Sequence, residues 1–192
     1  PDNRLIIVEG VGDLVLRNGK RIICIKLRRS DESGLVAYVN GSTGFAVALT
    51  ESNQIWGGYG YNVSCLGDMD SGAASADMNG RVNTQCLVSD SQTHPAANYC
   101  NTFSAVSSGK GSSGWYLPAA GELKAMSYSY GAINLGLQKL SKTQISSNYY
   151  WSSSETYYGS GDLSAWVVGP SVGVVGNDYK YSSGRVRCVL AL

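Results

Sequence analysis

Two glutamates and one histidine are the first residues of this chain to consider as catalytic groups. Glu122 and Glu155 could serve as a general acid and a general base, the usual pair for proton transfer to and from a substrate. Their spacing defines no common geometry and no third partner stands beside them, so we expect Glu122 on a helix surface and Glu155 as the anchor of a turn. His94 precedes Pro95 at the start of an expected helix, which favours a capping or surface role. The sequence therefore predicts that the protein is not an enzyme.

The five cysteines offer a second kind of chemistry, redox pairing or metal binding. They are an odd number without CxxC spacing, which disfavours both a closed disulfide framework and a zinc site. We expect buried free thiols, with one disulfide as the alternative. Cys188 lies in an alternating Val-Arg-Cys-Val-Leu strand, where a small buried thiol is expected. No metal and no cofactor is predicted. The cysteines are Cys24, Cys65, Cys86, Cys100 and Cys188.

The charge pattern limits the possible partners. The net charge is +1, and the most basic stretch, residues 20–29, alternates with isoleucine and leucine as in a strand with one solvated face. Binding to nucleic acid depends on clustered Lys and Arg, so we expect no nucleic-acid partner. No apolar run approaches the roughly 18 residues that span a bilayer, and direct membrane insertion is not predicted.

Residues 148–184 have an unusual composition. Of these 37 residues, 25 are Asn, Tyr, Ser, Asp, Gly or Thr, and six of the chain's 13 tyrosines are among them. Antibody-like binding surfaces favour these types, because Tyr provides rigid contact area and the small residues provide adaptable hydrogen bonds. The composition predicts a ligand-binding surface, and an ordinary polar β surface is the alternative.

The elements that must position this surface follow from the hydrophobic pattern. The N-terminal part predicts a strand at Leu5–Val8 and a hairpin of Asp13–Arg17 with Arg21–Leu27 across Asn18-Gly19. A second hairpin is expected from Leu35–Val39 and Phe45–Leu49. After Trp56 a long segment with glycines and aspartates, to about residue 80, shows no period and predicts a loop.

Helices are expected in the middle of the chain and short strands at its end. One helix is predicted at Pro95–Val106, a second from Pro118, and a third around Ile133 and Leu137. The expected strands are residues 150–153, 165–168, 172–175 and 185–190. The 192 residues suffice for one compact core, in which we place Trp115, Trp151 and Trp166. The predicted class is α+β, with small, mostly antiparallel sheets, two or three helices and long loops.

Several spaced motifs resemble the C-type-lectin-like domains of bacterial surface and fimbrial proteins, abundant in gut Bacteroidetes. The motifs that carry this resemblance are Asp77–Thr84, Pro95–Ala97, Gly114–Leu123, Tyr150–Glu155, Ala165-Trp166 and Val186–Leu192. The resemblance implies a C-type-lectin-like domain over residues 35–192. Residues 1–34 would then form an N-terminal β-hairpin extension packed on the main domain.

The C-terminal composition also resembles the variable proteins of diversity-generating retroelements, which use a C-type-lectin-like scaffold. Asn codons of the form AAY randomised at their adenines yield Tyr, Ser, Asp, Gly and Thr but never a stop codon. The clusters Thr156–Asp162 and Asn177–Ser182 fit the residue types that such codons produce. They lie between Tyr150–Glu155, Ala165-Trp166 and Gly184–Leu192, which look like fixed scaffold segments. The resemblance implies a hypervariable surface that binds a receptor.

Two other functions of similar folds fit the sequence less well. A calcium-dependent lectin would carry Glu-Pro-Asn or Gln-Pro-Asp with Trp-Asn-Asp, and here Gly176-Asn177-Asp178 has no proline-centred partner. The formylglycine-generating enzymes end in a similar Arg-Cys strand, but they need a reactive cysteine pair in an upstream loop that this chain does not offer. Calcium-free contact of a glycan through tyrosines stays open.

The predicted function is ligand or receptor binding by a variable protein of an adhesin or phage receptor-binding type. A non-variable fimbrial or surface adhesin that binds glycan or protein is the alternative. The partner would be a protein or glycan receptor, at the cell surface, in a secreted form or on a phage tail; the oligomeric state is left open. The predicted binding residues are Tyr149, Thr156, Tyr157, Tyr158, Ser160, Asp162, Ser164, Asn177, Asp178, Tyr179, Tyr181 and Ser182.

Overall fold

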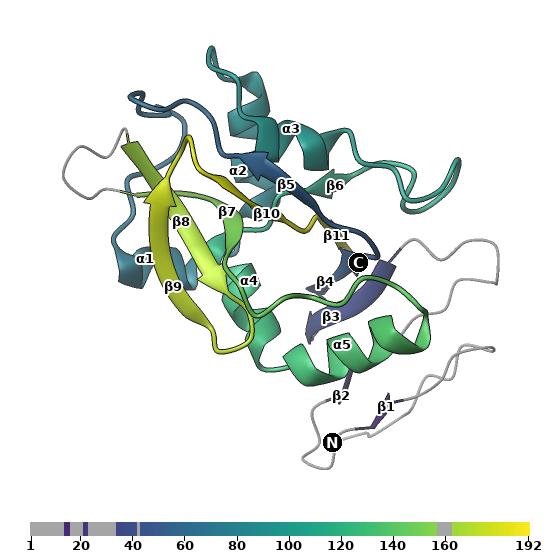
Figure 1. The fold of residues 1–192 in the computed structure, drawn as a ribbon. Helices are drawn as coiled ribbons and strands as arrows, with labels where there is room; N and C mark the ends of the chain where they lie inside the picture. Colours follow the sequence, from purple (N-terminus) through teal and green to yellow (C-terminus); the bar gives the residue numbers. More distant parts are fainter. Residues whose placement is uncertain (1–13, 16–20, 23–33, 42, 157–162) are drawn as a thin grey trace.

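A computed structural model describes residues 14–15, 21–22, 34–41, 43–156 and 163–192, and these form two sheets, five helices and a short N-terminal strand pair (Figure 1). The five-stranded sheet holds, in spatial order, β5 (Ser52–Ile55), β10 (Ser183–Val186), β7 (Tyr150–Glu155), β8 (Ser164–Gly169) and β9 (Val174–Tyr179). The four-stranded sheet holds β3 (Gly34–Asn40), β4 (Thr43–Ala48), β11 (Val189–Ala191) and β6 (Trp115–Tyr116). All strand pairs are antiparallel except β7 with β10, which confirms the predicted α+β class.

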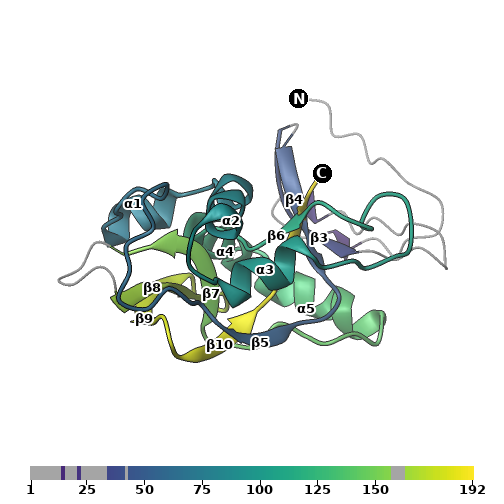
Figure 2. The ribbon, with the colours of Figure 1, turned by 90° about the horizontal axis from the view of Figure 1, so that it is seen from above.

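Both predicted hairpins have counterparts in the structure. β1 (Leu14–Val15) and β2 (Arg21–Ile22) pair antiparallel with Leu14 opposite Ile22, and β3 pairs with β4. The strand expected at Leu5–Val8 and the Asn18-Gly19 turn lie outside the described residues. The hairpin of β3 and β4 lies at one end of the molecule and α1 (Ser71–Ala76) at the other (Figures 1 and 2).

The strand predicted at residues 185–190 is instead two strands in different sheets, β10 and β11. The chain changes sheet at Arg187, whose buried guanidinium donates to Glu51 (3.2 Å) and to the carbonyl of Thr143 (2.7 Å). The carbonyl of Cys188 accepts from Ala48 of β4 (2.9 Å). A buried charge needs such partners, and Arg187 meets them at the point where the chain leaves one sheet for the other.

The helices are more numerous than predicted. They are α1, α2 (Gly80–Ser89), α3 (Pro95–Asn101), α4 (Ala120–Ser127) and α5 (Tyr130–Lys139). The prediction of a loop to residue 80 missed α1. The sequence also did not predict α2, because the buried face of that helix is small and polar. That face is Gly80, Asn83, Thr84 and Leu87, at helical spacing.

The predicted helix at Pro95–Val106 ends earlier, at Asn101. The Thr102 hydroxyl donates to the Asn98 carbonyl (2.8 Å), and Phe103 turns away to pack edge-on against Trp115, with ring centroids 5.1 Å apart. Packing of the half-buried Phe103 ring against Trp115 takes the place of another helical turn.

The core divides into two clusters on the two faces of the five-stranded sheet. Tyr150, Trp166 and Val168 face the cluster that includes α4 and α5, whereas Trp151, Val167 and Val186 face the cluster that includes Trp56 and α3. Trp115, Trp151 and Trp166 are all buried, which confirms their predicted core role. Strands buried on both faces provide a rigid frame for the loops at their ends.

Two disulfides contradict the expectation of free thiols. Cys65 pairs with Cys86, and Cys100 pairs with Cys188, so the predicted buried thiol at Cys188 is wrong. Cys24 lies outside the described residues. The pairs are separated by 21 and 88 residues, and pairings of this kind depend on tertiary proximity that spacing alone does not reveal.

Glu122 is buried rather than on a helix surface, which corrects the sequence prediction. Its carboxylate accepts from the backbone of Ala119 (2.8 Å) and from the Tyr116 hydroxyl (2.9 Å). This contact closes the first turn of α4, since Glu122, the third residue of the helix, reaches back to Ala119 just before it. Burial raises the pKa of Glu122 to about 7.

This raised pKa predicts that the protein loses stability as the pH rises. The folded protein binds the Glu122 proton more tightly than the unfolded chain, so the stabilisation is full below the ordinary value of 4.5 and is lost as the pH rises through about 7. Between pH 5 and pH 8 we expect wild type to lose up to about 3 kcal/mol of unfolding free energy relative to E122Q. Urea denaturation at both pH values measures the difference. Equal pH dependence in the two proteins would contradict the buried carboxyl.

Candidate ligand-binding face

Five of the predicted binding residues lie together in and after β9. Asn177, Asp178 and Tyr179 are exposed at the end of β9, Tyr181 is exposed in the turn to β10, and Ser182 beside it is half-buried. The backbone of Ser182 donates to the Tyr179 carbonyl (2.8 Å), and its hydroxyl donates to Asp178 (3.1 Å). These bonds close a tight turn that presents the tyrosines.

The other predicted residues have different positions. Tyr149 is exposed immediately before β7, and Ser164 is half-buried opposite Tyr179 in the sheet register. Thr156 is buried and its hydroxyl donates to the Ser164 carbonyl (3.3 Å), so it does not contribute to an exposed face. Outside the described residues lie Tyr157, Tyr158, Ser160 and Asp162.

Three exposed tyrosines form a cluster on this surface. The rings of Tyr179 and Tyr181 stack with centroids 5.4 Å apart, and Tyr59 meets Tyr181 edge-on at 4.8 Å. Each of the three keeps about half of its side chain exposed, at 49%, 55% and 49% for Tyr179, Tyr181 and Tyr59. We call Tyr59, Tyr179 and Tyr181 the tyrosine cluster.

Tyr59 was not among the predicted residues, because it comes from a loop about 120 residues earlier in the chain. A signal was present in the sequence: Gly57-Gly58-Tyr59-Gly60-Tyr61 has the same Tyr/Gly composition as residues 148–184. Only the fold shows that the two segments meet.

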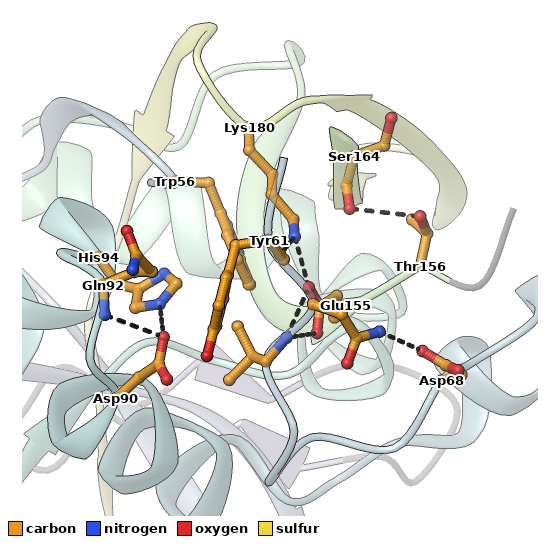
Figure 3. A network of polar contacts seen from close by, with 12 residues as sticks. Trp56, Tyr61, Asp68, Asp90, Gln92, His94, Glu155, Thr156, Ser164 and Lys180 are labelled. Atoms are coloured by element: carbon orange, nitrogen blue, oxygen red, sulfur yellow. Dashed lines mark hydrogen bonds and ion pairs between the residues drawn. The ribbon is translucent and has the colours of Figure 1, made fainter. Parts of the chain in front are cut away.

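The residue between Tyr179 and Tyr181, Lys180, forms a buried ion pair with Glu155 (Figure 3). Lys180, between the two clustered tyrosines, is fully buried, and its ammonium group donates to Glu155 at the end of β7 and to the Tyr61 carbonyl (2.7 Å). Glu155 also accepts from the backbone of Val63 (3.1 Å). Burial raises the pKa of Glu155, and Lys180 opposes this by stabilising the carboxylate.

The backbone of Lys180 is held as firmly as its side chain. Its N–H donates to Leu163 (2.9 Å), its carbonyl accepts from Gly57 (3.0 Å), and its ammonium group lies 5.0 Å from the centre of the Trp56 ring. Lys180 therefore joins the two segments that carry the tyrosine cluster. The expected role of Glu155 as an anchor agrees with these contacts, although it anchors a loop and a strand end rather than a single turn.

His94 is buried, which corrects the expected surface or capping role. It occupies the residue before α3, but its side chain does not cap the helix; it hydrogen-bonds to Asp90 (2.9 Å) and meets the Trp56 ring edge-on at 5.0 Å. Burial lowers the pKa of His94, with Asp90 acting in the opposite direction. The imidazole packs against Trp56, whose ring also lies near the Lys180 ammonium group (Figure 3).

A groove is lined in part by Asp178 and Ser183, on either side of the turn between β9 and β10. It has a volume of about 270 Å³ and includes Tyr149 and Asp178 from the predicted set. Its lining is Asn53, Asn148, Tyr149, Trp151, Val167, Asp178, Ser183, Gly184 and Arg185. We call this the Tyr149 groove. Like the tyrosine cluster, it combines residues 148–185 with an early segment, here β5.

The positions of the described acidic, histidine and cysteine side chains give little support for a catalytic pair or a metal site. Glu122 and Glu155 have separate partners, Tyr116 and Ala119 for the first, Lys180 and Val63 for the second. Within the described part of the chain, no three His, Cys, Asp or Glu side chains form a group able to hold a metal ion. Among the described residues there is also no helix long and apolar enough to cross a membrane.

Comparison with known proteins shows similarity in structure. No family model and no curated protein sequence matches the chain. A fimbrial protein from Bacteroides ovatus has a similar structure, with a TM-score of 0.58 and 21% sequence identity over 76% of this chain. The chain corresponds to 35% of the length of that protein. At this identity the similarity concerns the fold.

Proposed function

We propose that this protein is a surface-exposed, adhesin-type binding domain with a C-type-lectin-like scaffold, which binds a protein or glycan receptor through the tyrosine cluster and the residues beside it. The observation that carries this proposal is the tyrosine cluster, whose two segments are joined through the buried Lys180. The fold shared with a fimbrial protein supports an adhesin role. Two disulfides support a location outside the cell, where they persist.

The physical properties of the cluster suit binding. Exposed tyrosines supply large contact area with few torsions to immobilise, and a rigid support reduces the entropy lost on association. Such residues carry most of the binding energy in many interfaces. Asn177, Asp178 and Ser182 add polar groups around the rings. Tyr157, Tyr158, Ser160 and Asp162 remain part of the proposed face.

We also propose that the residues of this face are diversified by a diversity-generating retroelement. Asn177, Asp178, Tyr179 and Tyr181 are exposed and have residue types that randomised AAY codons produce. Lys180, which interrupts the run, is buried and belongs to a residue type that codons ending in C or T cannot encode, as expected of a fixed scaffold position. The coding DNA tests this proposal: a nearby copy of the 3′ end that differs at adenines, beside a reverse transcriptase gene, supports it. Without such a copy, a non-variable fimbrial or surface adhesin is the better proposal.

A formylglycine-generating activity has no support in the described residues. Cys188, the cysteine of the similar Arg-Cys strand, is bonded to Cys100, and both are buried. A disulfide sulfur in the core is not an available thiolate nucleophile.

The tyrosine cluster is expected to dominate adhesion. Beads coated with the protein are applied to mucin-coated surfaces and to epithelial cells, and the Y59A/Y179A/Y181A variant should adhere about tenfold less than wild type, or weaker still. Its melting temperature should fall by only a few degrees, since all three side chains are half exposed. The matched control is Y128A, a 70% exposed tyrosine at the end of α4.

A further inference from the structure

We propose that the Tyr149 groove is a calcium-independent subsite for one neutral sugar residue of a glycan. This inference rests on the proposed binding function and names the class of ligand. The groove differs from the tyrosine cluster in shape, because it is a depression of about 270 Å³ rather than a group of projecting rings. Small-molecule sites start near this size, at roughly 300 Å³.

Tyr149 provides an aromatic platform at the groove. Its ring lies over Gly169 of β8 and Gly176 of β9, since a Cβ built on either glycine would be 3.6 Å from it. The strands hold the ring, while half of the side chain (50%) stays exposed. The weakly acidic C–H groups on one face of a pyranose ring complement the electron-rich face of tyrosine.

The polar groups of the groove match the alternating donors and acceptors of sugar hydroxyls. Asn53 and Asn148 supply amides that both donate and accept, and Asp178 supplies an acceptor. In the described part of the chain, neither amide side chain is hydrogen-bonded to another residue. A hydroxyl group can satisfy either amide as a donor or as an acceptor.

The charges of the groove favour a neutral ligand. Arg185 is its basic residue, but the guanidinium is paired with Glu51, and Asp178 is its acidic residue. The groove therefore lacks the free arginine cluster that phosphate or sulfate recognition requires.

A second depression, of about 580 Å³, fits a sugar less well. It is lined by Ser71, Gly72, Ser75, Ala76, Lys124, Gly173 and Val175. This lining presents small residues and one lysine, without an aromatic platform. We therefore assign the sugar subsite to the Tyr149 groove.

Binding to an array of immobilised neutral and acidic oligosaccharides, followed by calorimetry with the best oligosaccharide, tests the assignment. Wild type is expected to bind neutral glycans equally well with and without EDTA, Y149F to stay within about threefold, and Y149A to lose about tenfold or more. N53A should weaken binding without affecting the platform, and Y128A should bind as wild type. Thermal melts establish that each variant is folded.

Three results would overturn the assignment: folded wild type that binds no glycan, binding that EDTA abolishes, or binding that survives both Y149A and N53A. Periodate treatment of the adhesion targets separates this inference from the proposed function. If beads still adhere to oxidised targets through the tyrosine cluster, the ligand is a protein; the adhesin proposal then stands and the sugar subsite fails. If no adhesion occurs to treated or untreated targets, the adhesin proposal fails on its own test.

Discussion

Replacing Lys180 with methionine is expected to lower the free energy of unfolding by about 3 to 5 kcal/mol at pH 7. The substitution leaves the Glu155 carboxyl buried, and its one remaining described contact is the Val63 amide. Removing one partner of a buried pair exposes the full desolvation cost of the other. Since burial already raises the pKa of Glu155, the loss of Lys180 raises it further, and the destabilisation should grow as the pH rises.

The double variant E155Q/K180M separates the charge from the packing. Glutamine keeps an acceptor for Val63 and carries no charge, so the double variant should recover most of the lost stability. Urea denaturation of wild type, both single variants and the double variant gives the coupling between the residues. A loss below about 1 kcal/mol in K180M would match a solvent-exposed pair and contradict the buried anchor.

Removal of the Cys100–Cys188 disulfide is the second large effect. In the C100A/C188A variant we expect a loss of about 4 to 5 kcal/mol, because the bond closes a segment of 88 residues and restricts the unfolded chain. The bond also fixes α3 to the point where the chain passes from β10 to β11. Equilibrium denaturation without reductant measures the change.

The second disulfide provides the matched comparison. Cys65–Cys86 closes 21 residues, so C65A/C86A should lose about 3 kcal/mol. Mass spectrometry of non-reduced peptides establishes which bonds are present in each variant. A larger loss from the shorter loop would show that strain or local packing, rather than chain entropy, governs the stability of these links.

The sequence predicts well where hydrophobic residues form short runs or follow a regular period. The β3–β4 hairpin consists of two short apolar runs on either side of Asn40-Gly41, and α5 repeats Ile133 and Leu137 at helical spacing, so the sequence predicts both. α2 was missed because Asn83 and Thr84 are buried through hydrogen bonds, to Asp77 and to the carbonyls of Gly80 and Leu117. A polar buried face has no hydrophobic period to detect.

The candidate site divides in the same way. Composition predicted Tyr149, Asp178, Tyr179 and Tyr181 as surface residues, and all four are exposed, because residues for exposed contact have a local signature. Tyr59 and Asn53 depend on which loops the fold brings together, and composition carries no such information. Lys180 shows the limit most clearly. No role was predicted for Lys180, because its role depends on contact with a glutamate 25 positions away.

The adhesion assay on Y59A/Y179A/Y181A is the most direct test of the proposed binding face. Wild type, this variant and Y128A are compared on the same targets after thermal melts have shown all three to be folded. The predicted result is that the triple variant loses about tenfold or more of adhesion while Y128A keeps it. If the folded triple variant adhered as strongly as wild type, the tyrosine cluster would not be the binding face.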